Sequence, residues 1–113
     1  ELNLWLPQPG EPVVYVCRSN ISGAFVNVRL GVVKKVTQRG YVHLDRVTES
    51  FFRHDETTFF QTGRSNFRTS IRPASADDLS VLPPFNDIGR AQAVARAWND
   101  NARKEREAAH AGG

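Results

Sequence analysis

The sequence predicts a mainly β protein, a small β-barrel followed by a C-terminal α-helical extension. A β run is predicted at residues 25–37, where apolar residues alternate with Asn27, Arg29 and Gly31, which is the pattern of a strand with one buried face. A turn closed by Gly40 then leads into a second alternating run. Beyond Pro84 the apolar residues recur at helical spacing, so the chain is expected to end in a helix.

Length and composition limit the protein to one modest domain. The chain has 113 residues, of which 40% are hydrophobic and 24% charged, as in ordinary globular proteins. No apolar run approaches the roughly 18 residues that a membrane span needs. A single cysteine, Cys17, permits no internal disulfide and fits a reducing compartment. We therefore expect a cytoplasmic protein without membrane contact.

Residues 1–8 are expected to form a non-helical N-terminal arm, and residues 9–73 the barrel. Prolines on both sides of Gly10 prevent a helix at the junction, and Trp5 among leucines indicates that the arm packs onto the body. Val13 begins the first strand, and Gly31 is expected to bend or bulge the second. The remaining strands are predicted at residues 41–47, at residues 51–53 with a continuation at 59–60, and at residues 67–72.

Residues 74–113 are expected to hold three pieces. Ser75 caps a short helical turn, and Pro83 with Pro84 forms a stiff hinge. Asn86 or Asp87 then caps an amphipathic helix that runs to about residue 109. Its narrow apolar stripe consists of Ile88, Ala91, Val94, Ala95, Trp98 and Ala102.

The order of these features resembles small SH3-like barrels of prokaryotic and phage origin, including the KOW-type family. The resemblance covers residues 9–73 and rests on four segments: PGEPVVYV (9–16), LGVVKKV (30–36), YVHL (41–44) and FFR (51–53). It implies binding to RNA, or to ribosomal and transcription proteins; other barrels of this shape bind peptides or proteins. The chain lacks the compact KOW glycine spacing and adds a long C-terminal helix, which weakens the implication for nucleic acid more than that for the barrel.

The basic charge of the chain lies in the barrel. Residues 12–73 hold ten Lys or Arg and four Asp or Glu, whereas the remainder holds five and eight. Such asymmetry favours an anionic partner, most commonly nucleic acid, although an arginine-rich solvated surface is the alternative. Tyr41 can stack on a base while nearby cations meet phosphates, unless its ring merely packs across the hairpin. The candidate nucleic-acid-binding residues are Lys34, Lys35, Arg39, Tyr41, His43, Arg46 and Arg53.

The helical stripe has two interpretations. It packs on the barrel, or it remains available to a partner beyond the hinge, either a second copy of the chain or another protein. Trp98 is a frequent type of interface anchor, which favours the second interpretation. The candidate partner-binding residues are Ile88, Val94, Trp98 and Ala102.

Enzymatic chemistry has no clear signature, and no catalytic residue, metal site or cofactor is predicted. His43 and Asp45 share one strand face, but a solvent-facing polar pair is the simpler interpretation. Cys17 falls in an apolar strand as a small core residue. We expect a non-enzymatic protein that binds RNA or DNA. The alternative is a protein-interaction module, such as a phage or plasmid factor that inhibits or redirects a host protein.

Overall fold

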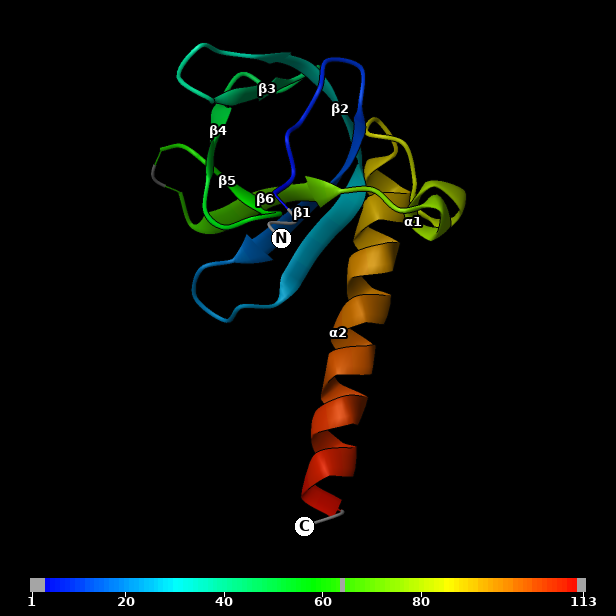
Figure 1. Ribbon diagram of the computed structural model, residues 1–113. Coiled ribbons are helices and arrows are strands. Elements are labelled where there is room, and N and C mark those ends of the chain that lie inside the picture. The colour runs from blue at the N-terminus through cyan, green and yellow to red at the C-terminus, as the bar shows by residue number, and fades with distance from the viewer. Residues whose placement is uncertain (1–3, 64, 112–113) are drawn as a thin grey trace.

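The computed structural model describes residues 4–63 and 65–111, which form a closed antiparallel β-barrel followed by two helices (Figure 1). The strands follow chain order around the barrel, and β6 pairs back onto β1. Their bounds are β1 Pro12–Ser19, β2 Phe25–Val36, β3 Val42–Leu44, β4 Ser50–Arg53, β5 Phe59–Gln61 and β6 Phe67–Pro73, and the helices are α1 Ala76–Val81 and α2 Ile88–Ala111. The predicted fold class is confirmed. Residues 1–3 of the predicted arm and residues 112–113 of the predicted extension lie outside the described residues.

The barrel interior is filled by alternate residues of the strands. The buried side chains of this first core are Val13, Val33, Val42, Leu44, Phe51, Phe59 and Ile71. Of the bend or bulge predicted at Gly31, the bulge is absent, because Gly31 pairs regularly with Val13. A Cβ at Gly31 would lie 3.3 Å from the Leu44 side chain, so the glycine allows close packing there. The register of β2 shifts instead at two other places, between Val33 and Lys35 at the start of the hairpin and opposite Cys17 and Arg18 of β1.

The arm is held against the barrel by the polar and aromatic groups of Trp5. Its ring meets Phe59 edge-on at 5.4 Å, and its indole N–H donates to the Glu11 carboxylate over 2.8 Å. Its backbone N–H donates to the Glu56 carbonyl over 2.8 Å. The prediction that the arm packs onto the body is therefore confirmed for the described part of the arm.

A second core lies outside the barrel, beneath α2. Val14, Val16 and Val28 point away from the interior and are covered by Leu82 and Ala95. An uninterrupted apolar run such as that around Val14 is typical of a strand buried on both faces. The helix thus completes the burial of β1 and β2 (Figure 1).

The segment that was predicted to be a hinge is packed in place. Pro83 is fully buried, and its carbonyl accepts a 2.9 Å hydrogen bond from the Leu30 N–H. Phe85 then meets the ring of Tyr15 edge-on at 5.2 Å. Asp87, one of the two predicted caps, begins α2 by accepting a 3.1 Å hydrogen bond from the Arg90 N–H. This connection joins helix and barrel into one structure, which corrects the predicted separation.

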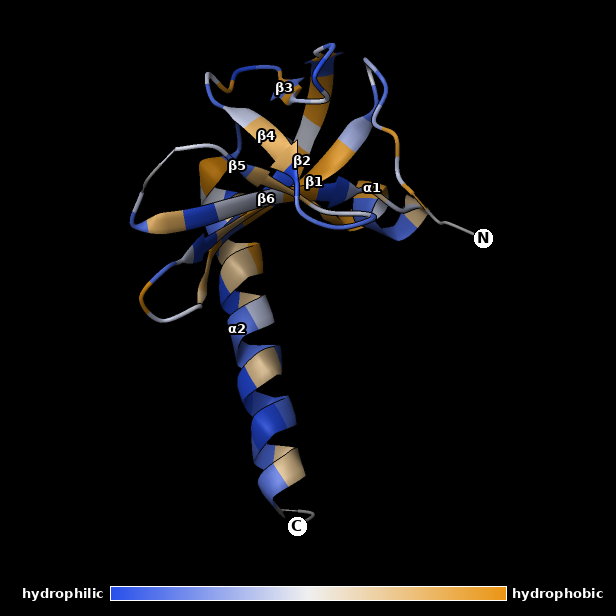
Figure 2. Cartoon of the chain, turned by 60° about the vertical axis from the view of Figure 1, so that its left-hand side comes forward, coloured by the Kyte–Doolittle hydropathy of each residue, from blue (hydrophilic) through white to orange (hydrophobic). Residues whose placement is uncertain are grey.

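The two halves of α2 have different surroundings. The first half runs along the barrel, whereas the second projects beyond it and is mainly hydrophilic (Figures 1 and 2). Arg103 forms ion pairs with both Asp100 and Glu107 at 3.2 Å. Ion pairs between residues three or four apart in sequence stabilise a helix that has no other support. Neither helix of the described chain is long and apolar enough to cross a membrane.

Candidate functional site

Two phenylalanine doublets place rings on both sides of the barrel wall. Successive residues of a strand point to opposite faces, so one ring of each doublet points inward and the other outward. Phe51 and Phe59 are the buried members. Phe52 and Phe60 are the outward members, and they face each other directly across β4 and β5. Phe52 keeps 41% of its surface exposed.

Tyr41 extends this arrangement onto the neighbouring hairpin. Val42 pairs with Phe51, so in the antiparallel register Tyr41 falls beside Phe52. Tyr41 is 39% exposed, and it lines a groove of about 690 Å³ together with Arg39 and Phe52. Tyr41, Phe52 and Phe60 are called the aromatic row below. Because neighbouring strands lie about 4.8 Å apart, these rings follow one another across the sheet.

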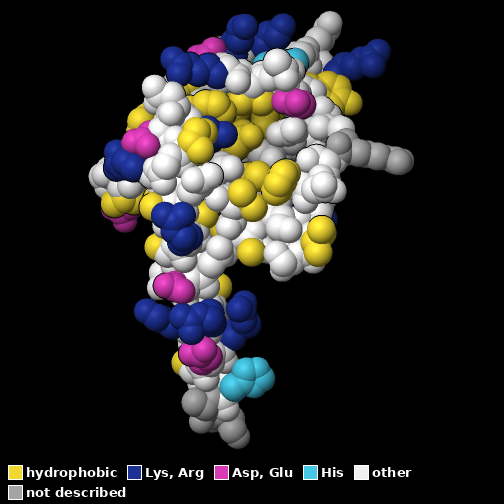
Figure 3. All heavy atoms as spheres, turned by 180° about the vertical axis from the view of Figure 1, so that it is seen from behind, with side chains coloured by type: hydrophobic (Ala, Val, Ile, Leu, Met, Phe, Trp, Pro, Cys, Tyr) yellow, Lys and Arg dark blue, Asp and Glu magenta, His cyan; other side chains and the backbone are white. Residues whose placement is uncertain are grey.

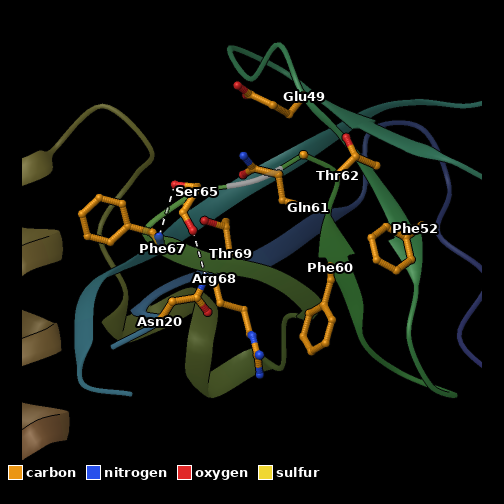
Figure 4. A pocket seen from close by; sticks show the side chains of 11 residues that line it. Asn20, Glu49, Phe52, Phe60, Gln61, Thr62, Ser65, Phe67, Arg68 and Thr69 are labelled. Carbon is orange, nitrogen blue, oxygen red and sulfur yellow. Dashed lines mark hydrogen bonds between the residues drawn. The ribbon is translucent and has the colours of Figure 1, made fainter. Parts of the chain in front are cut away.

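The Phe60 end of the aromatic row carries further flat or charged groups. His54 stacks on Phe60 with 4.2 Å between ring centres and 26° between the planes. The Arg68 guanidinium lies 5.6 Å from the same ring. Figure 4 shows Phe60 between Phe52 and Arg68, at the side of a groove of about 640 Å³ that Phe67 also lines.

The β2–β3 hairpin supplies cations beside the row. The bulge after Val33 interrupts the alternation, so that the consecutive residues Lys34 and Lys35 are both exposed. Lys35 pairs with His43 across the hairpin, and both line a groove of about 480 Å³ with Lys34 and Arg46. Arg46 has φ of 67°, a left-handed conformation that costs a non-glycine residue roughly 1–3 kcal/mol.

These cations lack anionic partners within residues 4–63 and 65–111. The ion pairs found there belong to Arg72, Arg90 and Arg103, and none includes a hairpin residue. Lys and Arg side chains gather at the barrel end opposite to the projecting helix (Figure 3). The hairpin therefore presents uncompensated positive charge to an approaching anion.

The structure divides the predicted nucleic-acid-binding residues between two grooves. Four of them line the hairpin groove, namely Lys34, Lys35, His43 and Arg46. Arg39, Tyr41 and Arg53 line the neighbouring groove with Phe52. Arg53 also fastens the arm: its guanidinium donates to the carbonyl oxygens of Trp5, Asp55 and Glu56 over 2.6–3.0 Å. Arg53 therefore has a structural role at the edge of this groove, and its contact with a ligand stays a prediction.

The apolar stripe of α2 is largely committed to the barrel. Val94 and Trp98 pack against the second core, and the Trp98 ring meets Phe25 edge-on at 5.2 Å. Asn99 follows, donating to the Phe25 carbonyl and accepting from its N–H over 2.9 and 2.8 Å. Ile88 remains exposed, and Ala102 lines a groove beside the β1–β2 loop. The expectation of an available stripe around Trp98 is wrong, because the barrel occupies it.

A cluster around Arg29, between β1, β2 and the connection that leads into α2, also serves the structure. The Arg29 guanidinium lies 5.0 Å from the ring of Tyr15 and 4.0 Å from that of Phe85, and it donates to the Phe85 carbonyl over 2.7 Å. Burial raises the pKa of the Tyr15 hydroxyl, although the charge of Arg29 opposes the shift. Burial likewise raises the pKa of the Cys17 thiol, which disfavours a reactive thiolate.

Groups suited to acid–base or metal chemistry do not converge in the described part of the chain. His43 is half-buried and Asp45 exposed, and no hydrogen bond joins their side chains among the described residues. Within residues 4–63 and 65–111, no three His, Cys, Asp or Glu side chains gather in a geometry that would hold a metal. The surface with distinct chemistry is the aromatic row and its cations.

Sequence reasoning missed Phe52, Phe60 and Arg68 as site residues. The signal was present, because a Phe doublet inside a strand necessarily leaves one ring outside. Which ring points outward, and that the two outward rings face each other, depends on strand register. Comparisons with protein-family models, curated proteins and solved structures found no match to this chain.

Proposed function

We propose that the protein binds single-stranded nucleic acid, with bases stacked on the aromatic row and phosphates held by the hairpin cations. One observation carries the proposal: three partly exposed rings follow one another on neighbouring strands beside cations that lack carboxylate partners. Every base has a face that can stack on an aromatic ring, so such a row binds with little sequence preference. A cytoplasmic location fits this role, since single-stranded RNA is abundant there.

Several features favour a single strand over a duplex. The row displays ring surfaces across a sheet, which suits bases that are splayed out and not paired. Duplex recognition uses elements that enter a groove and cations that follow two backbones. The resemblance of residues 9–73 to KOW-type barrels also supports RNA as the partner.

An extended peptide is the second candidate ligand. Phe67 is 48% exposed and lines the groove that also includes Phe52 and Phe60. Three phenylalanines around one groove suit apolar peptide side chains as well as bases. The two ligands differ in salt dependence, because only phosphate contacts give affinity that falls steeply with salt.

Substitution of Phe52 tests the proposal. Phe52→Leu keeps an apolar side chain but removes the ring, so it should weaken binding of fluorescent oligo(U) or oligo(dT) by about 1–3 kcal/mol, the contribution of one stacked base. Phe52→Trp should retain the affinity because it keeps a ring. Fluorescence anisotropy at low salt measures both variants.

The matched control is Val81→Ala, which trims an exposed apolar residue on α1, away from the row. It should bind as the wild-type chain does. Equal affinity of Phe52→Leu and wild type for both oligonucleotides, with both proteins folded, would contradict the stacking role. Affinity that does not change with salt would favour the peptide.

A further inference from the structure

Two arginines face each other directly across β1 and β6. Arg18 and Arg68 are paired in the antiparallel register, and both are exposed. Like charges in this arrangement repel and destabilise a sheet. Neither side chain forms an ion pair with any other described residue. The pair thus places two uncompensated charges where a bound anion would relieve their repulsion.

Each guanidinium lies against an aromatic ring, and that of Arg18 is also held by a hydrogen bond. Arg18 donates from Nε to the Gly23 carbonyl over 3.0 Å and lies 4.2 Å from the centre of the Phe25 ring. Arg68 lies near Phe60, the last ring of the aromatic row. An arginine side chain has five N–H donors. Of the donors of Arg18 and Arg68, only Nε–H of Arg18 has an acceptor among the described residues. Positioned guanidinium groups of this kind are suited to bidentate binding of phosphate.

A series of grooves connects the pair to the row and to α2. Phe60 and Arg68 line both the groove of the row and the next groove, of about 450 Å³, in which Arg18 joins them. Arg18 also lines a third groove, of about 330 Å³, between the β1–β2 loop and α2. Arg106 enters that third groove from α2 and forms no ion pair with the described residues.

Three acidic residues line these grooves, namely Glu49, Asp55 and Asp100. Glu49, in the groove of the row, accepts a 3.0 Å hydrogen bond from the Thr48 hydroxyl. Asp55 accepts hydrogen bonds from the N–H groups of Thr57 and Thr58, and the bond from Thr57 contributes most to lowering its pKa. Asp100 pairs with Arg103, which also contacts Glu107. The positive charge of the other arginines therefore remains available.

We propose that Arg68, Arg18 and Arg106 form a phosphate-binding track that continues from the Phe60 end of the aromatic row to α2. The inference rests on the proposed function and adds the path of the strand. A short strand occupies the rings, whereas a longer strand also lies along the arginines. The track gives a role to the projecting part of α2, which the barrel core does not need.

Oligonucleotides of two lengths test the track. Probes of about 4 and about 12 nucleotides, as oligo(U) and as oligo(dT), span the site sizes of small single-strand-binding domains. Arg106→Gln should leave the affinity of the short probe unchanged. For the long probe it should reduce the slope of log affinity against log salt by about 0.7, the contribution of one phosphate contact. Adding Arg68→Gln should bring the total reduction to about 1.4.

The control is the double variant Arg96→Gln with Lys104→Gln, which removes two charges from exposed positions of α2 outside these grooves. It should retain the long-probe slope, and thermal melts should show all variants folded. The track is wrong if the Arg106 variant binds the long probe with the wild-type slope. It is also wrong if the control double variant loses as much as the Arg68 and Arg106 double variant. If the wild-type chain binds neither probe, the proposed function fails and the track fails with it.

Discussion

The outer face of β1 and β2 is covered by α2, whereas the outer face of β3, β4 and β5 is bare. Val14 and Val28 on the covered face are fully buried. Phe52 and Tyr41 on the bare face retain about two-fifths of their surface. The chain thus supplies its own cover for aliphatic residues and leaves aromatic residues exposed beside cations. This contrast is why we propose that the bare face binds a ligand.

Removal of α2, which covers β1 and β2, should have the largest effect on the stability of the protein. A chain ending at residue 82 would expose Val14, Val16 and Val28, and each fully buried side chain of this size contributes about 1.5–3 kcal/mol. Small domains are stable by only about 5–15 kcal/mol in total. We expect this truncation to abolish cooperative unfolding in thermal melts followed by circular dichroism.

A shorter truncation provides the control. Removing residues 104–113 deletes helix that projects beyond the barrel, and it should leave the melting temperature nearly unchanged (Figure 1). A stable, cooperatively unfolding chain of residues 1–82 would show that the covered face does not need α2.

Trp98→Ala should have a smaller effect of the same kind. The side chain is half-buried against Phe25, so roughly half of the 3–5 kcal/mol lost at a fully buried Trp is expected, about 2 kcal/mol. Urea unfolding measures the loss, and Trp98→Phe should restore most of it. Light scattering should give the same mass for variant and wild type. Unchanged stability with a lower mass would instead support a dimer through the helix.

Neutralising the hairpin should leave stability intact and affect only binding. Lys34, Lys35 and Arg39 are exposed and form no ion pairs among the described residues, so changing all three to Gln should not alter the melting temperature. The slope of log affinity against log salt should fall by about 2 for a single strand. The charge-matched control changes Arg90, Arg96 and Lys104 of α2. Equal slopes for the two triple variants would show that only net charge matters.

Much of the barrel could be predicted from the sequence because its rules are local. Alternation around Val42 and Leu44 indicated which side chains point inward, and Gly40 indicated the turn, which it closes with φ of 89°. Ser75 was predicted to cap a helix and does so, with Asp78 completing the capping box. These features depend on neighbours within a few residues.

The packing of α2 and the make-up of the candidate site could not be predicted, because both depend on contacts between segments that are distant in the sequence. Trp98 has the spacing of a helical stripe whether its partner is the barrel or another protein, and only the three-dimensional structure brings it to Phe25. The pairing of Phe52 with Phe60 likewise follows from register. Alternation from buried Phe51 puts Arg53 on the inward side, but its hydrogen bonds to the arm join distant segments and could not be predicted.

Nuclear magnetic resonance of the aromatic side chains during titration with oligo(U) tests the central claim most directly. Stacked bases shift the signals of the rings that they cover. With a short probe of about 4 nucleotides, which does not reach the arginine track, we expect large shifts for Tyr41, Phe52 and Phe60. We expect none for Trp98, which packs on the covered face. Shifts centred on Trp98, or saturable binding that leaves the three rings of the row unperturbed, would contradict the assignment of the bare face as the binding surface.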